Sequence, residues 1–361
     1  MSSETKTYLK TVKIVNFRNY FDKTFNFSPK MNIIVGENAV GKSNLADAIS
    51  VLASTKSFRS IKDPFLLKKE MPFYRLEGYF LRNGLESKRI VMFDGEKRSQ
   101  KVNDNLLKTS EYLGEIIPVA FTADDLLIIK GSPSERRRFL DLILCQIDKE
   151  YLKNLVHYQK TLKERNIFLK NPGKSPYNRS FLVSLTKYLL TTAKPIIEKR
   201  KVFISELNEE IKPFLQDLAI DQDIFLEYLP NIVEENQGNY LEKVIQADIL
   251  AKKTTFGITR DELKIANAKG LLMNVASQGQ IRAVALGLKL AAAKILEKKN
   301  YEIIIILDDV LSELDKVRQD NVLKLIPKNV QTFITTTSTN EINDEILKNS
   351  HLIYIEREEN K

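Results

Sequence analysis

The chain has 361 residues and a formal net charge of +9, from 56 Lys and Arg against 47 Asp and Glu. This length allows two or more domains with a substantial core, and the basic excess favours a polyanionic partner, although dispersed positive charge also serves solubility alone. A single cysteine (Cys145) and two histidines (His157 and His351) exclude an internal disulfide framework and a Cys- or His-rich metal site. We find no export signal or membrane-length apolar run, and therefore expect a soluble cytoplasmic protein without a membrane partner.

The first 103 residues alternate between strand and helix patterns. "LKTVKIVNF" (9–17) alternates apolar and polar residues and predicts a strand. "MNIIVGENAVGKSNLADAISVL" (31–52) predicts an apolar strand, a glycine-bounded loop and a helix whose buried stripe is Leu45, Ala48, Ile49 and Leu52. Residues 73–103 indicate an antiparallel meander with polar turns.

A helical middle section begins at "KGSPSERRRFLDLIL". Ser132 is expected to cap the first helix, with Pro133 at its first position and Glu135 completing a capping box. The sequence pattern predicts mainly helix to about residue 216, with a break near 171–178. Long helices here would form an arm or hairpin, which is either an ordinary helical subdomain or a partner-binding one.

The last third returns to strand and helix alternation. We expect a strand at 223–229, a helix at 239–252, and strands at 301–310, 331–338 and 351–356. Ser277 opens an Ala/Leu helix and forms a capping box with Gln280. Such an uncharged, glycine-containing helix start can also hold an anion. The whole pattern predicts an α/β domain interrupted by an insertion.

One loop fits a phosphate-binding motif at every fixed position, between an apolar strand and an amphipathic helix. Its N–H groups would surround the phosphates, Lys42 would reach the β and γ oxygens, and the Ser43 hydroxyl would bind Mg²⁺. The motif consists of Gly36, Glu37, Asn38, Ala39, Val40, Gly41, Lys42 and Ser43.

A second acidic motif follows the buried strand "IIIIL" (303–307). Asp308 at the strand's carboxyl end can hold Mg²⁺ through water, and Asp309 can polarise the attacking water. Taken alone, the pair is equally compatible with a strand-ending turn.

"SQGQ" before an Ala-rich helix, followed by "LDDVLSELD", resembles the signature motif, Walker B strand and D-loop of ABC-type ATPases. Together with "NFRNY" (16–20), "TKSFRS" (55–60), "FTADDLLIIKGSPSERRRFLD" (121–141) and "LKERN" (162–166), the chain is similar along essentially its whole length to the RecF family of SMC-related DNA-repair ATPases. The resemblance implies an α/β fold, an ABC-type P-loop ATPase head with an inserted, mainly helical arm. The expected divisions are a head at 1–128, the arm at 129–255 and the rest of the head at 256–361.

In that family two heads sandwich two ATP molecules, and the signature helix of one meets the γ-phosphate held by the other. The resemblance therefore implies catalytic roles for Lys42, Asp308 and Asp309. It places Arg18, Asn19 and Asn44 beside the nucleotide of their own copy. It also places a set of residues against the partner's ATP, namely Ser277, Gln278, Gly279, Gln280 and, in the D-loop 312–315, Asp315. The local alternative for Ser277 is a capping box without a ligand.

Two features bear on how fast ATP is hydrolysed, and a third segment departs from the family pattern. Thr335–Thr337 stand where ABC transporters carry a switch histidine, so Thr337 would position the γ-phosphate more weakly. Asp309 replaces the usual glutamate. "GITRDE" (257–262) lacks the Pro and His expected there, and leaves Arg260 and Asp261 either functional or a structural ion pair.

Four basic clusters are candidates for phosphate contact without base readout, or are solvated faces: Lys56/Arg59/Lys62, Lys68/Lys69, Lys97/Arg98/Lys101 and Arg136/Arg137/Arg138. At least one of the three arginines 136–138 is expected to pair at the junction of arm and head.

The resemblance implies a weak, DNA-stimulated ATPase whose ATP-driven homodimer clamps duplex DNA at single-strand gaps. RecR and RecO would assist it in loading RecA during recombinational repair, replication recovery and SOS induction. A transporter ATPase subunit is an alternative that predicts a switch histidine. An SMC-like chromosome tether is another, and needs long heptad arms with a hinge or a paired-cysteine hook.

Overall fold

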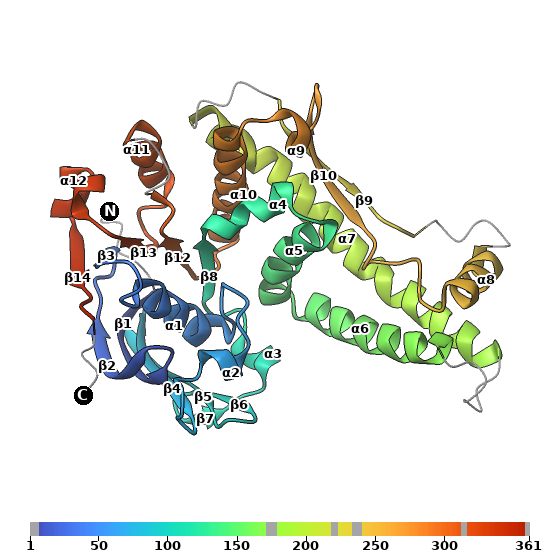
Figure 1. Cartoon of the computed structure of the whole chain (residues 1–361), viewed down its shortest axis with the longest axis horizontal. Helices are drawn as coiled ribbons and strands as arrows, with labels where there is room; N and C mark the ends of the chain where they lie inside the picture. Colours follow the sequence, from blue (N-terminus) through green and yellow to red (C-terminus); the bar gives the residue numbers. More distant parts are fainter. Residues whose placement is uncertain (1–6, 171–178, 218–222, 233–239, 312–315, 358–361) are drawn as a thin grey trace. The chain divides into compact units, whose positions relative to one another are not determined.

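The computed structural model describes residues 7–170, 179–217, 223–232, 240–311 and 316–357 (Figure 1). The expected break at 171–178 and the D-loop at 312–315 lie outside these residues. Backbone contacts divide the chain into unit 1 (1–125, 213–220 and 286–361) and unit 2 (126–212 and 221–285). The structure therefore differs from the expected division at its second boundary, because residues 256–285, with the signature segment, belong to unit 2 rather than to the head.

An antiparallel sheet forms one layer of unit 1, in the order β2-β1-β4-β5-β6-β7. Alternating burial along β1 and β4 gives the sheet one apolar face, as the sequence pattern predicts. Strand β2, which the sequence reading did not anticipate, pairs with β1. The strands are β1 Thr7–Phe17, β2 Tyr20–Asn26, β4 Tyr74–Arg82, β5 Leu85–Phe93, β6 Arg98–Val102 and β7 Asn105–Leu106.

A parallel sheet forms the second layer of unit 1, in the order β14-β3-β13-β12-β8. All residues of β12 and β13 are buried, which explains the continuous apolar run of β12. Because the strands are parallel, the loops that follow β3, β12 and β13 leave from one edge. The strands are β3 Met31–Val35, β8 Ile117–Phe121, β12 Ile303–Asp308, β13 Gln331–Thr336 and β14 Ser350–Tyr354.

Helix α1 (Lys42–Ser54) packs between these two sheets and is buried on most sides. The helix is therefore more buried than the single apolar stripe of the sequence predicts. Gly78 on β4 permits the close approach, since a Cβ there would lie 2.3 Å from Leu52 Cδ2. The other helices assigned to this unit are α2 Asp63–Leu66, α3 Thr109–Tyr112, α11 Lys316–Leu325 and α12 Asp344–Lys348.

Unit 2 is mainly helical, with a small antiparallel sheet in the order β11-β10-β9. Arg165 on α6 hydrogen-bonds Thr186 on α7, and Arg200 on α7 hydrogen-bonds Tyr151 on α6, so the two helices form the expected hairpin (Figure 1). Two of the boundaries between the units, at 212/213 and 285/286, fall within α7 and α10. The elements are α4 Leu127–Lys130, α5 Pro133–Ile147, α6 Lys149–Lys170, α7 Arg179–Asp217, β9 Phe225–Leu229, α8 Tyr240–Ala251, β10 Glu262–Asn267, β11 Gly270–Leu271, α9 Leu272–Val275 and α10 Gln278–Lys298.

The start of α5 differs in one respect from its prediction. Ser132 is the N-cap and Pro133 the first helical residue, as expected. The capping box with Glu135 is wrong, because the Ser132 hydroxyl lies 2.5 Å from the Ser134 hydroxyl and makes no bond to the helix N–H groups.

A buried charged cluster holds unit 2 together and accounts for the "GITRDE" segment. The Asp261 carboxylate is fully buried and lies 2.9 Å from Arg200 Nη1, whereas Arg260 is exposed. Arg200 also pairs with Asp141 at 2.8 Å. The proposed Arg260–Asp261 pair is therefore wrong, and Asp261 acts in the interior of unit 2. Losing one partner of such a pair typically costs about 3–5 kcal/mol.

No helix in the described parts of the chain is long and apolar enough to cross a membrane.

Candidate functional site

The phosphate-binding loop starts directly after β3 and ends at the first turn of α1. Gly41 caps α1 with φ 119°, a conformation that L side chains rarely adopt. A Cβ at Gly41 would lie 2.4 Å from Asn19 Nδ2, and one at Gly36 would lie 2.5 Å from the Ile355 carbonyl oxygen. Both motif glycines are therefore required by close contacts as well as by the motif.

Lys42 lies inside this loop and is only 6% exposed. Its Nζ donates to the carbonyl oxygens of Gly36 and Glu37, each at 2.8 Å. Burial lowers the pKa of Lys42, and the carboxylates of Asp309 and Asp308 oppose that shift. The ammonium group thus lies among neutral acceptors, and the oxygens of a phosphate would be stronger partners for it.

Arg18 and Asn19 are placed against this loop, as expected. Asn19 Nδ2 donates to the Val40 carbonyl at 2.9 Å, and Asn19 Oδ1 accepts from Asn44 Nδ2 at 2.7 Å. Arg18 Nε contacts Asn44 Oδ1 at 3.4 Å. The sequence reading missed Tyr20, whose hydroxyl donates to the Gly41 carbonyl at 3.0 Å. The "NFRNY" segment therefore braces the loop from the side of the antiparallel sheet.

The acidic motif lies at the end of β12, with Asp308 as its last residue. Thr335 on the neighbouring strand β13 connects both aspartates, because its Oγ1 donates to Asp308 Oδ1 and accepts from the Asp309 backbone N–H, each at 2.9 Å. Asp309 has a positive φ of 56°, which costs energy in a non-glycine residue and is held here by that bond. The sequence reading did not anticipate this role for Thr335, and the expected role of Thr337 at the γ-phosphate stays a prediction.

The oxygen groups of Ser43 and Asp308 fit a magnesium ion. Burial raises the pKa of Asp308, and hydrogen bonds from Ser43 and Thr335 oppose that shift. The Ser43 side chain and the Asp308 carboxylate are thus adjacent, and both are hard oxygen ligands of the kind Mg²⁺ prefers. Among the described residues there is no cluster of three or more His, Cys, Asp or Glu that could hold a metal, so an ion here would also need oxygens from phosphate and water.

Arg59 and Asp47 belong to the site, although the sequence reading put Arg59 in a surface cluster and overlooked Asp47. Arg59 Nη2 donates to Asn44 Oδ1 at 2.8 Å and to the Ser43 carbonyl at 3.3 Å. The fully buried Asp47 carboxylate accepts from Ser57 Oγ and from the Phe58 N–H, and lies 4.0 Å from Arg59 Nε. Asp47 therefore positions the loop that brings Arg59 to the first turn of α1.

Desolvation dominates the electrostatics of Asp47. Burial raises its pKa to about 6, against the favourable effects of Arg59 and of the hydrogen bonds from Ser57 and Phe58. A signal for this residue was present in the sequence, because an aspartate at position 47 interrupts the apolar surface of α1. A charged residue in such a surface requires its own partners.

The signature segment opens α10 in unit 2. The predicted capping box is confirmed: Ser277 N donates to Gln280 Oε1 at 2.9 Å, and Gln280 N donates to Ser277 Oγ at 3.3 Å. Ser277 and Gln278 are exposed, and Gly279 and Gln280 are half-buried. The preceding apolar residues Met273 and Val275 are also exposed, by 44% and 40%. Residues 277–280 therefore do not pack into the core of their own chain.

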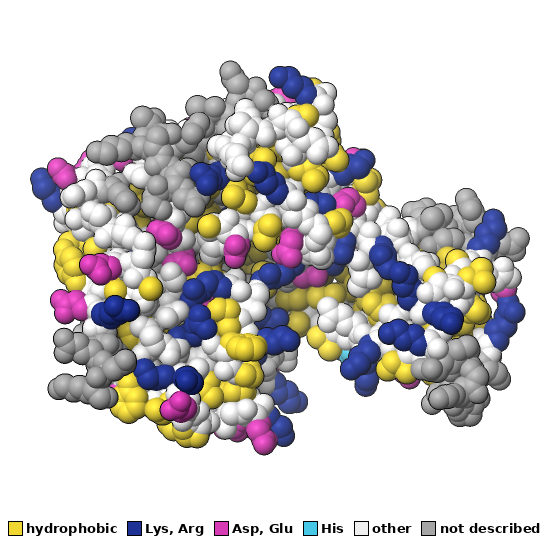
Figure 2. Space-filling model, viewed as in Figure 1, with side chains coloured by type: hydrophobic (Ala, Val, Ile, Leu, Met, Phe, Trp, Pro, Cys, Tyr) yellow, Lys and Arg dark blue, Asp and Glu magenta, His cyan; other side chains and the backbone are white. Residues whose placement is uncertain are grey.

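Several basic residues proposed for phosphate contact are instead held by this chain. Arg98 pairs with Asp63 at 3.2 Å, and Arg136 with Glu262 at 2.8 Å. Lys68 Nζ donates to the Asn19 carbonyl at 2.7 Å. On the face shown in Figure 2, Lys and Arg side chains are dispersed, with Asp and Glu between them. The structure therefore does not single out one basic cluster as a phosphate-contacting surface.

Comparison with known proteins finds relatives that match nearly the whole chain. A family model described as the RecF/RecN/SMC N terminal domain matches residues 8–75. The DNA replication and repair protein RecF of Lysinibacillus sphaericus is 34% identical over 364 aligned positions, which cover 97% of this chain and 98% of that protein. The protein of the same name from Shouchella clausii is 35% identical, with the same coverage of both chains.

Solved structures extend this likeness to three dimensions. The structure of "the recombination mediator protein RecF-ATP in RecFOR pathway" superposes with a TM-score of 0.86, 33% identity and 94% coverage of each chain. A structure of an Smc head bound to the C-winged helix domain of ScpA has a TM-score of 0.53 and 17% identity, and thus shares only the fold.

Proposed function

Because the chain belongs to the RecF family of DNA replication and repair proteins, we propose that it is a clamp on DNA whose closure is controlled by ATP. ATP binding and ATPase activity accord with family membership and with the ATP-bound RecF structure that it matches. Closure is the additional step: the loop of one copy holds ATP, and the signature segment of a second copy completes that ATP-binding site. The observation that carries this proposal is the exposed, uncharged helix start at Ser277, which has no role in the core of its own chain.

The residues of this chain divide the work between two copies. In one copy the loop Gly36–Asn44 holds the triphosphate, Lys42 binds its β and γ oxygens, and Asp309 orients the attacking water. In the partner copy Ser277 and the N–H groups at the start of α10 would donate to the γ-phosphate. Charge-assisted hydrogen bonds contribute about 1.5–3 kcal/mol each, and the helix dipole adds roughly 0.3–2 kcal/mol. A few such bonds can decide whether two copies stay together.

Ser43 and Asp308 would hold Mg²⁺, which supplies charge neutralisation at the phosphates when it is bound. The Ser43 hydroxyl and the Asp308 carboxylate would supply its protein ligands, and Thr335 would keep the carboxylate oriented. The shorter side chain of Asp309, in place of a glutamate, and the threonine run 335–337, in place of a histidine, favour slow hydrolysis. Loss of the γ-phosphate removes the contacts between copies, so hydrolysis releases the clamp.

DNA is the proposed cargo of the closed dimer, in duplex form and at junctions of single and double strand. The net charge of +9 and the dispersed basic side chains favour contact with phosphates rather than bases. Pairing two copies doubles those contacts, so DNA affinity should depend on ATP. RecR and RecO are proposed as partners that use the clamped DNA to load RecA, in line with the RecFOR pathway of the matched structure.

Light scattering combined with DNA binding tests this proposal. The wild type with ATP and Mg²⁺ should become a dimer, whereas Ser277→Arg, which puts a bulky cation in the partner's phosphate site, should stay a monomer. DNA affinity should rise with ATP for the wild type alone. It should fall with salt at a log–log slope of about −0.9 for each phosphate contacted. A wild type that remains monomeric with ATP, or a Ser277→Arg variant that dimerises normally, would contradict the clamp.

A further inference from the structure

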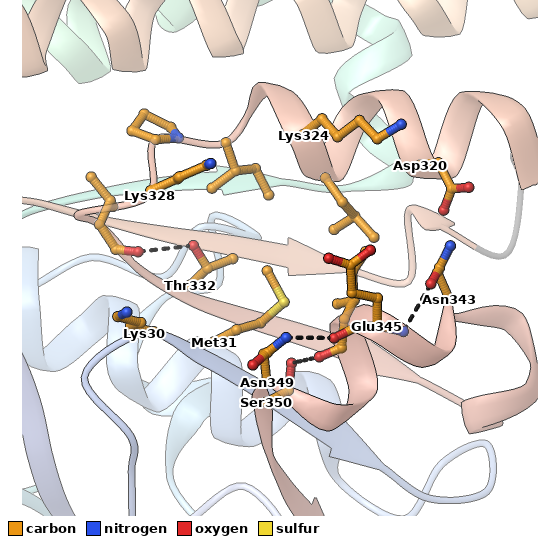
Figure 3. A pocket seen from close by; sticks show the side chains of 15 residues that line it. Lys30, Met31, Asp320, Lys324, Lys328, Thr332, Asn343, Glu345, Asn349 and Ser350 are labelled. Carbon is orange, nitrogen blue, oxygen red and sulfur yellow. Dashed lines mark hydrogen bonds between the residues drawn. The ribbon is translucent and has the colours of Figure 1, made fainter. Parts of the chain in front are cut away.

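A pocket of about 430 Å³ lies in unit 1 at the edge of the parallel sheet opposite the nucleotide loops (Figure 3). It is lined by the first residues of three strands, because Met31 of β3 pairs with both Thr332 of β13 and Ser350 of β14. Its size falls within the range of about 300–1,000 Å³ that is usual for ligand pockets. An occupant would therefore leave the ATP site open.

The pocket has an apolar lining from Met31, Leu323, Ile326, Pro327, Val330 and Ile346. Most of the polar side chains around it are already engaged in local structure. Asn343 Oδ1 caps α12 by accepting from the Glu345 N–H at 2.9 Å, Asn349 Nδ2 donates to the Glu345 carbonyl at 2.8 Å, and Ser350 Oγ donates to the Ile346 carbonyl at 2.6 Å. These bonds, drawn in Figure 3, leave few polar groups to orient a small polar molecule.

Charged side chains on the rim are the remaining recognition groups. Figure 3 shows Lys30 and Lys328 at one end of the pocket, Asp320 with Lys324 near it at the other, and Glu345 between them. Within the described part of the chain, the structure pairs neither Lys30 nor Lys328 with a carboxylate, and both are exposed. An apolar floor with two lysines at one end and charges of both signs at the other suits an extended or helical segment that presents different side chains along its length.

We propose that this pocket binds a segment of another protein in which one or two large apolar side chains stand next to aspartate or glutamate. The apolar side chains would fill the floor, and the carboxylates would meet Lys30 and Lys328. A second copy of this chain is a poorer fit, because each copy carries a net charge of +9 and would repel the other. The site is separate from the proposed ATP-driven contact between copies, which uses the other edge of the sheet.

Selection from a displayed library of random peptides tests the site. The library, of peptides about twelve residues long, is selected on the whole chain and counter-selected on the Lys30→Glu/Lys328→Glu double variant. Enriched peptides should combine large apolar residues with Asp or Glu, and should bind the wild type at least about tenfold more tightly than the double variant, which is a difference of about 1.4 kcal/mol. Replacing their acidic residues with Lys should restore binding to the double variant.

The matched control is Lys153→Glu/Lys187→Glu, which makes the same charge change at exposed lysines of unit 2 and should bind the selected peptides as the wild type does. Peptides that are basic, or that bind both double variants equally weakly, would overturn the proposal. So would a selection that yields only peptides indifferent to Lys30 and Lys328. If the wild type self-associates without nucleotide and the Lys30→Glu/Lys328→Glu variant does not, the site belongs to a second copy. If decanoate binds with the same dependence on the two lysines and no peptide binds, the site belongs to a small amphiphile. Either result would also overturn the proposal.

Discussion

Individual side chains around the P-loop show what a motif alone does and does not reveal. The loop from Gly36 to Ser43 and the Asp308 that ends β12 were predictable, because the first follows a fixed motif whose glycines have close neighbours and the second follows a continuous apolar strand. Thr335 and Asp47 were not, because each acts through a partner distant in the sequence, Thr335 on β13 and Asp47 against residues 57–59. Such contacts become visible only when strand order is known.

Thr335→Val should separate ATP binding from hydrolysis. The valine keeps the shape of the side chain but removes the hydroxyl that orients Asp308 and holds the Asp309 N–H. Loss of an orienting hydrogen bond at a metal-binding carboxylate typically lowers activity by about 10–100-fold, so we expect that decrease in steady-state ATPase rate. Binding of a fluorescent ATP analogue should change much less. Thr332→Val, the same substitution on the same strand, is the control, and an equal loss of rate in both variants would argue against a positioning role for Thr335.

Asp47→Asn should change how stability depends on pH. The raised pKa of Asp47, about 6 in the folded protein, means that the folded state holds this proton more tightly than the unfolded chain. The resulting stabilisation is present below the unfolded pKa of about 3.9 and is lost as the pH rises through about 6, an effect on the order of 2–3 kcal/mol. Between about pH 4.5 and 7 the wild type should lose stability relative to Asp47→Asn in urea denaturation. A difference between the two proteins that stays constant over this range would show that Asp47 ionises normally.

At the scale of elements, the strands and long helices were largely predictable, but their grouping was not. The alternating residues 9–17 predicted β1, the expected meander at 73–103 contains β4, and the continuous apolar run 303–307 predicted β12. The sequence could not show that α1 lies between two sheets, nor that residues 256–285 join unit 2, because both depend on contacts across long stretches of chain. The same limit explains why the sequence left open whether Asp261 pairs with Arg260, whereas the structure pairs it with Arg200.

The short elements before the signature helix offer a test of the dimer surface. Leu271, Met273 and Val275 are 39–44% exposed and directly precede Ser277. If the signature segment meets a partner copy, these apolar side chains should be covered there. Met273→Glu should then weaken ATP-dependent dimerisation by about tenfold or more, since burying an unpaired carboxylate is costly. Sedimentation with ATP measures this, with Leu85→Glu on β5 as a control at a 76% exposed leucine. Equal effects of the two substitutions would place Met273 outside the contact.

At the scale of the whole molecule, the central claim is that neither copy contains a complete ATP site. Lys42 and Asp308 come from unit 1, and the signature residues come from unit 2 of the second copy. This arrangement would make ATP the link between copies and hydrolysis the event that separates them. Family membership, the +9 net charge and the exposed start of the signature helix all accord with a clamp on DNA.

The most direct measurement is the ATPase rate of two inactive variants, alone and mixed. Lys42→Met lacks a working loop but keeps its signature segment, and Ser277→Arg has the opposite defect. Each alone should be nearly inactive. An equal mixture should recover up to about a quarter of the wild-type rate, because half of random pairings are mixed and each mixed pair has one complete site out of two. A mixture as inactive as its components, or a Ser277→Arg variant that is fully active alone, would contradict a site shared between copies.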